Sequence, residues 1–352
     1  MKKKERDYSL DFLRGMAVVF MVLTHVNAVL YKGYSTLFST ITWWGATICY
    51  TTFLFVFGAV YGIKIQKEKM DRIRMLKRAT IFLIIYFASA FSVILVKYGI
   101  GGLLENIGDI LFLSNIPEFT EFLLPFVFYL VIFALFTGSL IRMKSWSWGY
   151  LLVGVLLFII SDYLYDMDWG PNFRETIKGL FVGHEDVHTF GLLSYAPILM
   201  TGLYWGVEVI GKGKKNQIQT LLLSLLCGLF LAFLNYTAFS SWNRWPPSVV
   251  FLLYGIVFCL VVLFLYGLVS KAKVITKPII YLGQHSLSFY YVQIVLTLII
   301  GRLLNWRRND ELWALLMYLV SFVVTWLILV TFNIIIKRIS PVLPKKFLKL
   351  TR

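Results

Sequence analysis

Two ionisable residues, Arg14 and His25, lie in the first apolar stretch of the chain. In a helix each residue turns the chain by about 100°, so their spacing returns to nearly the same face about 16 Å farther along the axis. A guanidinium in hydrocarbon costs at least ~2.5 kcal/mol on insertion scales, and such residues usually face a bundle interior or a wet cavity. The pair therefore predicts a polar stripe that runs most of the way across the first helix.

The two side chains suit the transfer of a group to an alcohol. A histidine can act as general base at neutral pH, whereas the planar donor fork of arginine suits a phosphate or a thioester-bearing donor. We therefore expect His25 and Arg14 to be catalytic residues. Two other interpretations stay open: Arg14 could form an ion pair with the nearby Asp11, and His25 could form a hydrogen bond between helices.

His184, Glu185 and His188 form a His-Glu-x-x-His motif. On a helix this spacing places two imidazoles on one face to bind zinc, with the glutamate as the base of a metalloprotease. Such an enzyme also needs a third ligand, but the candidate Glu208 falls on the opposite side of the next expected span. The preceding Gly183 indicates a polar outer loop. We therefore expect no metal cofactor, and we interpret the motif as an outer-loop cluster for acceptor contact or incidental metal binding.

The elements that position these residues are predicted to be membrane helices. Of 352 residues, 59% are hydrophobic and 15% are charged, and the mean hydropathy is +0.76, far outside the soluble range. A window of roughly 20 residues, the length that crosses a bilayer, gives about ten spans. They lie near residues 10–31, 40–63, 76–97, 119–141, 147–165, 190–210, 217–240, 248–270, 279–303 and 311–336. The sequence thus predicts an all-α, polytopic integral membrane protein.

The charged residues predict how these spans are oriented. The net charge is +16, but the basic residues gather in alternate loops, as the retention of Lys and Arg in the cytoplasm requires, which argues against nucleic acid as a partner. The basic segments are residues 2–6, 64–78, 142–144, 212–215, 271–277 and 337–352. We therefore expect both termini in the cytoplasm and a multi-pass location in the cell membrane.

No soluble domain is expected, because the longest stretch outside the spans, residues 166–189, is too short for a core of its own. Residues 1–352 are therefore interpreted as a single transmembrane domain. The apolar segment 100–114 is too short to cross and is expected to be interfacial or re-entrant on the outer face. Pro125 and Pro197 fall inside expected spans, where a proline kinks a helix, and they favour a central cavity.

Four segments of the chain resemble the acyltransferase-3 family of the transmembrane acyltransferase superfamily. The first span of that family carries an arginine, ten residues and then a histidine, which is similar to residues 10–15 followed by His25 here. The other three segments are 53–58, with Phe57 where a serine is common, 244–248, which contains a Pro-Pro-Ser element, and 282–290, with Gln293 where many members have a second histidine. The resemblance implies a ten-span fold with its N-terminus inside.

The resemblance also implies an activity, the transfer of an acyl group from cytoplasmic acyl-CoA to a hydroxyl of an acceptor on the outer side. His25 would be the catalytic base or a transient acyl carrier, and Arg14 would position the donor. The acceptor in this family is usually a sugar hydroxyl of a cell-envelope glycan or of a lipid-linked precursor. We therefore expect acyl-CoA, most simply acetyl-CoA, as the donor substrate.

Further residues are candidates for binding the two substrates. Clustered cations at the cytoplasmic mouth of the third span could hold the CoA phosphates: Arg72, Arg74, Lys77 and Arg78. Ordinary positive-inside topology or binding of anionic lipid is the alternative for these four. Polar residues late in the chain could line the substrate cavity, with helix packing as the alternative: Ser286, Ser288, Tyr290 and Gln293.

A membrane acyltransferase is thus the favoured hypothesis, and two other classes remain. A transporter or flippase for a glycolipid or small solute would also have charged residues and proline-broken helices within the membrane. Only the resemblance of the first span separates the enzyme from that class. The zinc metalloprotease is the least favoured of the three.

Overall fold

The computed structural model describes residues 7–113, 116–169, 173–183, 190–213, 217–237, 242–303, 305 and 308–339. In these ranges every regular element is a helix. The α-helices are α1 (Ser9–Leu30), α2 (Thr36–Gln66), α3 (Arg72–Leu111), α4 (Leu123–Leu135), α5 (Thr137–Met143), α6 (Trp148–Tyr165), α7 (Phe173–Val182), α8 (Ala196–Tyr204), α9 (Gln217–Tyr236), α10 (Val249–Val269), α11 (Lys273–Gln284), α12 (Ser286–Leu298) and α13 (Glu311–Ile339). Two π-helical turns, Trp205–Gly211 and Ile299–Leu303, continue α8 and α12.

The predicted membrane spans agree with these helices. Among the described residues, seven helices are long and apolar enough to cross a membrane, and α4 with α5, bent by 80°, counts as an eighth if the pair is one span. Two shorter apolar helices, Ala196–Gly211 and Ser286–Arg302, fall in the two remaining predicted segments. Each of the ten predicted segments therefore contains a helix, and the prediction of an all-α, polytopic protein is confirmed.

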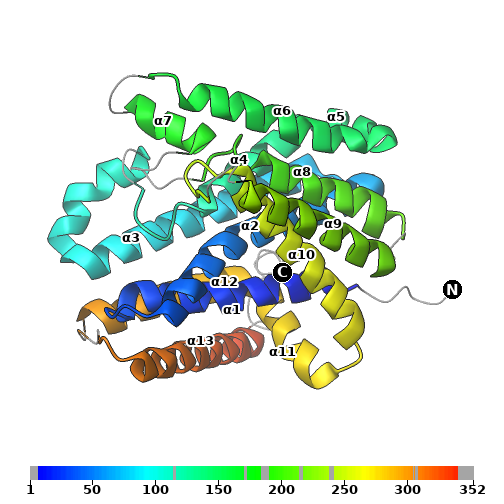
Figure 1. Cartoon of the computed structure of the whole chain (residues 1–352). Coiled ribbons are helices and arrows are strands. Elements are labelled where there is room, and N and C mark those ends of the chain that lie inside the picture. The colour runs from blue at the N-terminus through cyan, green and yellow to red at the C-terminus, as the bar shows by residue number, and fades with distance from the viewer. Residues whose placement is uncertain are drawn as a thin grey trace.

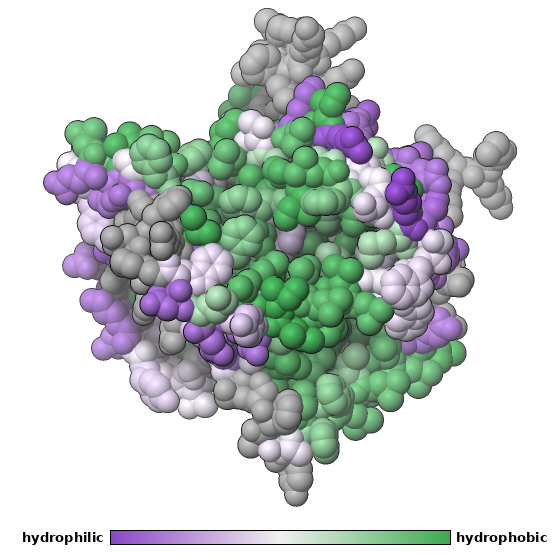
Figure 2. Space-filling view, turned by 90° about the horizontal axis from the view of Figure 1, so that it is seen from above, coloured by the Kyte–Doolittle hydropathy of each residue, from purple (hydrophilic) through white to green (hydrophobic). Residues whose placement is uncertain are grey.

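The helices run between two ends of one bundle. In Figure 1 the start of α1, the end of α8 and helix α11 lie at the right, whereas the far end of α3, the end of α6 and the start of α13 lie at the left. Segments that the sequence assigns to the cytoplasm thus share one end. Figure 2 shows a broad hydrophobic surface with hydrophilic residues gathered toward two opposite edges. Large side chains such as Leu152, Leu156 and Ile159 are exposed on α6, as a lipid-facing surface requires.

The sequence predicts that Pro125 and Pro197 kink helices, and this prediction is wrong. Pro125 and Pro197 lie in the first turns of α4 and α8, where the missing N–H has no helical partner in any case. Helix α3 is instead interrupted at Gly99, whose φ of 73° lies in the left-handed region. This break separates the expected span 76–97 from the short apolar segment that follows it.

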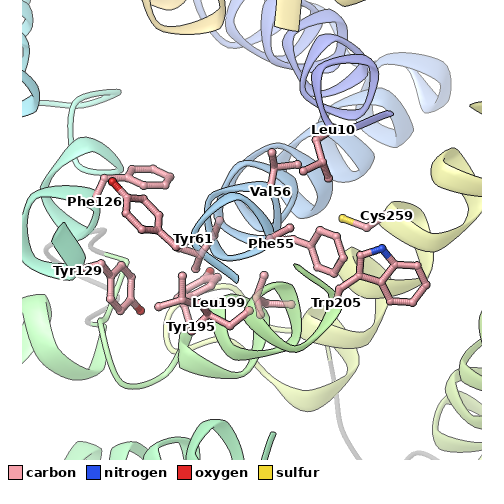
Figure 3. Packing of buried hydrophobic residues seen from close by; sticks show 14 of the residues in the cluster. Leu10, Phe55, Val56, Tyr61, Phe126, Tyr129, Tyr195, Leu199, Trp205 and Cys259 are labelled. Atoms are coloured by element: carbon pink, nitrogen blue, oxygen red, sulfur yellow. The ribbon is translucent and has the colours of Figure 1, made fainter. Parts of the chain in front are cut away.

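Helix α2 is the central element of the bundle, and 67% of its apolar stretch is buried. Figure 3 shows side chains of several other helices around it. Phe55 lies beside Trp205, with 6.4 Å between ring centroids, while Tyr61 projects on the side of Phe126. Because α2 has protein on most of its sides, its neighbours determine the shape of the space around it.

Helices α2 and α8 touch backbone to backbone through glycines. A Cβ added to Gly58 or Gly62 of α2 would lie 2.2 Å or 2.3 Å from a carbonyl oxygen of α8. A Cβ on Gly202 or Gly206 would in turn lie 2.2 Å or 2.1 Å from a carbonyl oxygen of α2. Small residues four apart on both partners allow membrane helices to approach this closely, and van der Waals packing then stabilises the pair.

The same kind of contact joins α1 to α11. A Cβ on Gly15 would lie 1.9 Å from the carbonyl oxygen of Ile279, and one on Gly283 would lie 1.7 Å from that of Asp11. Any larger side chain at either glycine must push the two backbones apart. The crossing therefore fixes the position of α1, which carries Arg14 and His25, against the late helices of the chain.

We predict that Gly202→Ala destabilises the protein, because the added methyl group has no space against the α2 backbone. Overpacking of this kind costs about 1–3 kcal/mol, so the melting temperature of the purified protein in lipid nanodiscs should fall. Gly228→Ala is the matched control, since nothing lies within 4 Å of a Cβ at that position on α9. Equal melting temperatures for the two variants would contradict the close contact between α2 and α8.

Candidate active site

A chain of hydrogen bonds fixes the orientation of His25. Its Nδ1 lies 2.8 Å from Oε1 of Gln293 on α12, and Nε2 of Gln293 donates to Oγ1 of Thr297 at 2.8 Å. With its amide nitrogen directed to Thr297, Gln293 presents an acceptor to His25, so Nδ1 carries the ring proton. Nε2 of His25 then holds the free lone pair, which is the form that a general base requires.

Two aromatic rings also hold the imidazole. Phe119 and Tyr290 make edge contacts with the His25 ring, with centroids 5.1 Å and 6.3 Å away. The hydroxyl of Tyr290 donates to the carbonyl oxygen of Phe119 at 2.5 Å, which ties the two rings to each other. His25 is thus fixed from three directions by side chains of α12 and of the segment before α4.

His25 opens onto a cavity of about 480 Å³, here called the outer cavity because it lies at the predicted outer half of α1. Aromatic residues form much of its wall: Tyr50, Phe53, Phe119, Phe122, Phe190 and Trp245. Three residues of the charged types line the same space, Glu118, Glu121 and Arg244. An apolar cavity with a few polar groups is the usual form of a small-molecule site.

Glu121 and Arg244 carry opposite charges in this cavity. Oε2 of Glu121 and Nε of Arg244 are buried and have no hydrogen-bond partner in the described part of the chain. Neither residue takes part in the ion pairs found there. The guanidinium instead lies over the rings of Trp245 and Phe190, at 4.2 Å and 4.9 Å from their centroids.

Sequence reasoning missed both of these residues as site candidates. Arg244 is only the first residue of the segment 244–248 that resembles a family motif, and no sequence pattern selects Glu121. The available signal was a carboxylate at position 121 inside the apolar segment 119–141. A charge within an expected span favours a functional role by the same argument that selected Arg14.

Arg14 opens onto a second space of about 710 Å³, here called the inner cavity. It also forms an ion pair with Asp11, with 3.8 Å between Nη1 and Oδ1, which is the alternative interpretation that the sequence left open. Nε2 of Gln284 donates to the other carboxylate oxygen of Asp11 at 3.3 Å. The two interpretations of Arg14 are therefore compatible: Asp11 orients its side chain, and the same side chain lines the inner cavity.

The inner and outer cavities share two wall residues, Phe53 of α2 and Phe122 just before α4. Tyr290 lines the inner cavity, and its ring also contacts His25. These three aromatic side chains form a partition, with Arg14 on one side and His25 on the other. The stripe predicted along the first helix therefore faces two adjoining spaces.

The remaining candidate residues are divided by the structure. Of the four basic residues at the start of α3, only Arg78 is among the residues that line the inner cavity. All four of these side chains are exposed, and Arg74 pairs with Asp71 at 3.1 Å.

The late polar residues are divided in the same way. Ser286, Ser288 and Tyr290 line the inner cavity. Gln293 is fully buried and holds His25, so it acts on the site through the histidine rather than as part of a cavity wall.

The motif at His184, Glu185 and His188 lies outside the described residues. In the described ranges, no group of three His, Cys, Asp or Glu side chains is placed to hold a metal ion. Glu208, the third ligand considered for a zinc site, accepts a hydrogen bond from Ser147 at 2.7 Å and pairs with Lys212 at 2.5 Å.

Comparison with known proteins gives one family. No curated protein matches the chain. The sequence profile of the acyltransferase domain family known as acyltransferase-3 matches residues 7–331, which is nearly the whole chain. This match includes the first-span pair, both cavities and the described part of every helix but the end of α13. The protein therefore belongs to the acyltransferase-3 family of membrane acyltransferases.

Proposed function

We propose that the protein transfers an acyl group, most simply acetyl, from acyl-CoA to a hydroxyl of a cell-envelope glycan or lipid-linked sugar, with His25 as the base. The proposal rests on one arrangement: the oriented His25 opens onto the outer cavity while Arg14 opens onto the adjoining inner cavity. A transferase that works across the membrane needs a donor space and an acceptor space that meet near one base. We also propose that the reaction occurs in the cell membrane, with the donor bound from the cytoplasmic side.

In the proposed reaction His25 Nε2 takes the proton of the acceptor hydroxyl as its oxygen attacks the thioester carbonyl. The new C–O bond forms, the C–S bond breaks, and the CoA thiolate leaves with the proton that His25 received. Gln293 accepts a hydrogen bond from Nδ1, and this stabilises the imidazolium that forms in between, as an oriented acceptor does in hydrolase triads. If the imidazole itself attacks the thioester, the same Nε2 becomes the acyl carrier.

The donor is proposed to occupy the inner cavity. Arg14 and Arg78 line this cavity and suit the CoA phosphates because a guanidinium binds them in a bidentate manner. The acyl group would extend toward the aromatic partition formed by Phe53, Phe122 and Tyr290. Only the acyl end needs to pass this partition, which leaves the charged CoA on the other side.

We predict that His25→Ala lowers the release of CoA from acetyl-CoA at least ~10²-fold, the usual contribution of a general base. Arg14→Ala should weaken turnover less, since it holds the donor and not the reacting proton. Purified protein in nanodiscs and a thiol reagent for free CoA provide the measurement. Full activity of His25→Ala would contradict the proposed role of His25 as the base. Movement of a labelled solute into liposomes without CoA release would favour a transporter.

Gln293→Leu should lower kcat by about tenfold or more, because the orienting partner of the reactive imidazole is lost. The KM for acetyl-CoA should change little, since Gln293 lies outside the inner cavity. Thr297→Val serves as the graded control: it removes the acceptor of the Gln293 amide but leaves Gln293 in place. Steady-state kinetics that show no loss of kcat in Gln293→Leu would contradict the role of this hydrogen bond.

Arg78→Gln is expected to raise the KM for acetyl-CoA by about tenfold, because a charge-assisted contact is worth about 1.5–3 kcal/mol. Arg72→Gln, on the same helix and exposed like Arg78 but outside the cavity wall, should leave that KM nearly unchanged. Initial rates at varied acetyl-CoA give both values. Equal effects of the two substitutions would show that general positive charge, and not the inner cavity, recruits the donor.

A further inference from the structure

The outer cavity is lined by a carboxyl group and a guanidinium that form no ion pair with each other among the described residues. Oε2 of Glu121 and Nε of Arg244 have no hydrogen-bond partner among the described residues, although both side chains line one cavity with His25. Leaving a buried charged group unsatisfied costs more than a neutral one, and the expected partner is then a ligand or water. A structural ion pair would join the two groups directly.

The two groups together limit the chemistry of a ligand that could bind to both of them. A carboxylate only accepts hydrogen bonds and a guanidinium only donates them, whereas a hydroxyl group does both. An anion bound to Arg244 would lie in the repulsive field of Glu121, and a cation bound to Glu121 would lie in that of Arg244. A neutral ligand with neighbouring hydroxyl groups satisfies both residues without adding a charge.

The walls of the cavity fit the apolar faces of such a ligand. Phe119, Phe122, Phe190 and Trp245 line it together with the two charged-type residues, and the ring surface that Arg244 leaves uncovered can contact the C–H faces of a saccharide. The volume of about 480 Å³ is in the range of small-molecule sites. Stacking on Trp245 and Phe190 also holds the guanidinium of Arg244 in place. The side chain therefore loses little further conformational entropy when a ligand binds.

We propose that Glu121 and Arg244 form an acceptor subsite that binds two neighbouring hydroxyl groups of a saccharide ring, the carboxylate accepting from one and the guanidinium donating to the other. This inference rests on the proposed function, since it specifies the acceptor side of that reaction. The clamp holds the ring in the outer cavity so that a further hydroxyl faces Nε2 of His25. A monohydric alcohol lacks one of the two contacts and binds poorly.

Binding is tested without catalysis, in a His25→Ala background. The probes are the methyl glycosides of glucose, galactose, mannose and N-acetylglucosamine, with tetrahydropyran-2-methanol as a ring that carries a single hydroxyl. The protein is held in nanodiscs, because a sugar-headed detergent would compete for the subsite. At least one glycoside should raise the melting temperature, as a ligand that binds only the folded state does, and the monohydric ring should not.

Glu121→Gln and Arg244→Gln should each abolish this shift, and Arg244→Lys should restore part of it because it keeps the charge but not the planar fork. The matched controls are Glu105→Gln and Arg302→Gln, two exposed charges outside the cavity wall, which should leave the shift intact. With active protein, the Glu121 and Arg244 variants should raise the KM for the bound glycoside at least tenfold while the KM for acetyl-CoA stays within about twofold.

Several outcomes would overturn the subsite. They are the absence of a shift with every glycoside, equal shifts with the monohydric ring, and full shifts in both variants. A larger shift with glucose 1-phosphate that depends on Arg244 alone would reassign the residue to an anion site. Because the melting experiment needs no acyl transfer, failure of His25-dependent CoA release in the parent protein would reject the proposed function separately from the binding result.

Discussion

The close contact of α1 with α11 at Gly15 and Gly283 is the interaction on which the candidate site depends. Lipid tails are as apolar as the helix surfaces, so the hydrophobic effect does not drive membrane helices together, and packing at small residues takes its place. At this crossing an added Cβ would meet a backbone carbonyl at 1.9 Å or 1.7 Å. The contact brings Asp11 beside Gln284 and, farther along the same pair of segments, His25 beside Gln293. These two polar contacts of α1 with the late helices α11 and α12 therefore depend on one glycine crossing.

Two kinds of polar group line or support the outer cavity. His25, Gln293 and Thr297 form a linear chain of two hydrogen bonds, and the bonded groups orient one another. Glu121 and Arg244 have buried atoms with no partner in the described ranges. Since an unsatisfied charge is costly in a low-dielectric interior, groups of the second kind indicate where a ligand binds. The same physical rule thus separates the residues that orient His25 from those proposed to bind the acceptor.

Gln293 and His25 have different roles in this member of the family. The resemblance leads one to expect a second histidine near this position, and a histidine there could exchange a proton. An amide can orient the ring of His25 and accept its Nδ1 proton, but it does not titrate. His25 is consequently the one group of the pair that can carry a proton, while the aromatic partition at Phe53 and Phe122 separates it from the inner cavity around Arg14.

The sequence by itself determined the all-α membrane class, the approximate positions of the long apolar helices and the placement of Arg14 and His25 on one helix, because hydrophobic length and helical spacing are local properties. It could not place Pro125 and Pro197, whose effect depends on where each helix begins, nor separate Arg78 from its basic neighbours, which share the same composition. Only the tertiary structure decided that Gln293, 268 positions away, orients His25, and that Glu121 and Arg244 meet in one cavity. These contacts depend on which helices cross and how closely, and the positions of the crossings are properties of the packed bundle rather than of any one segment.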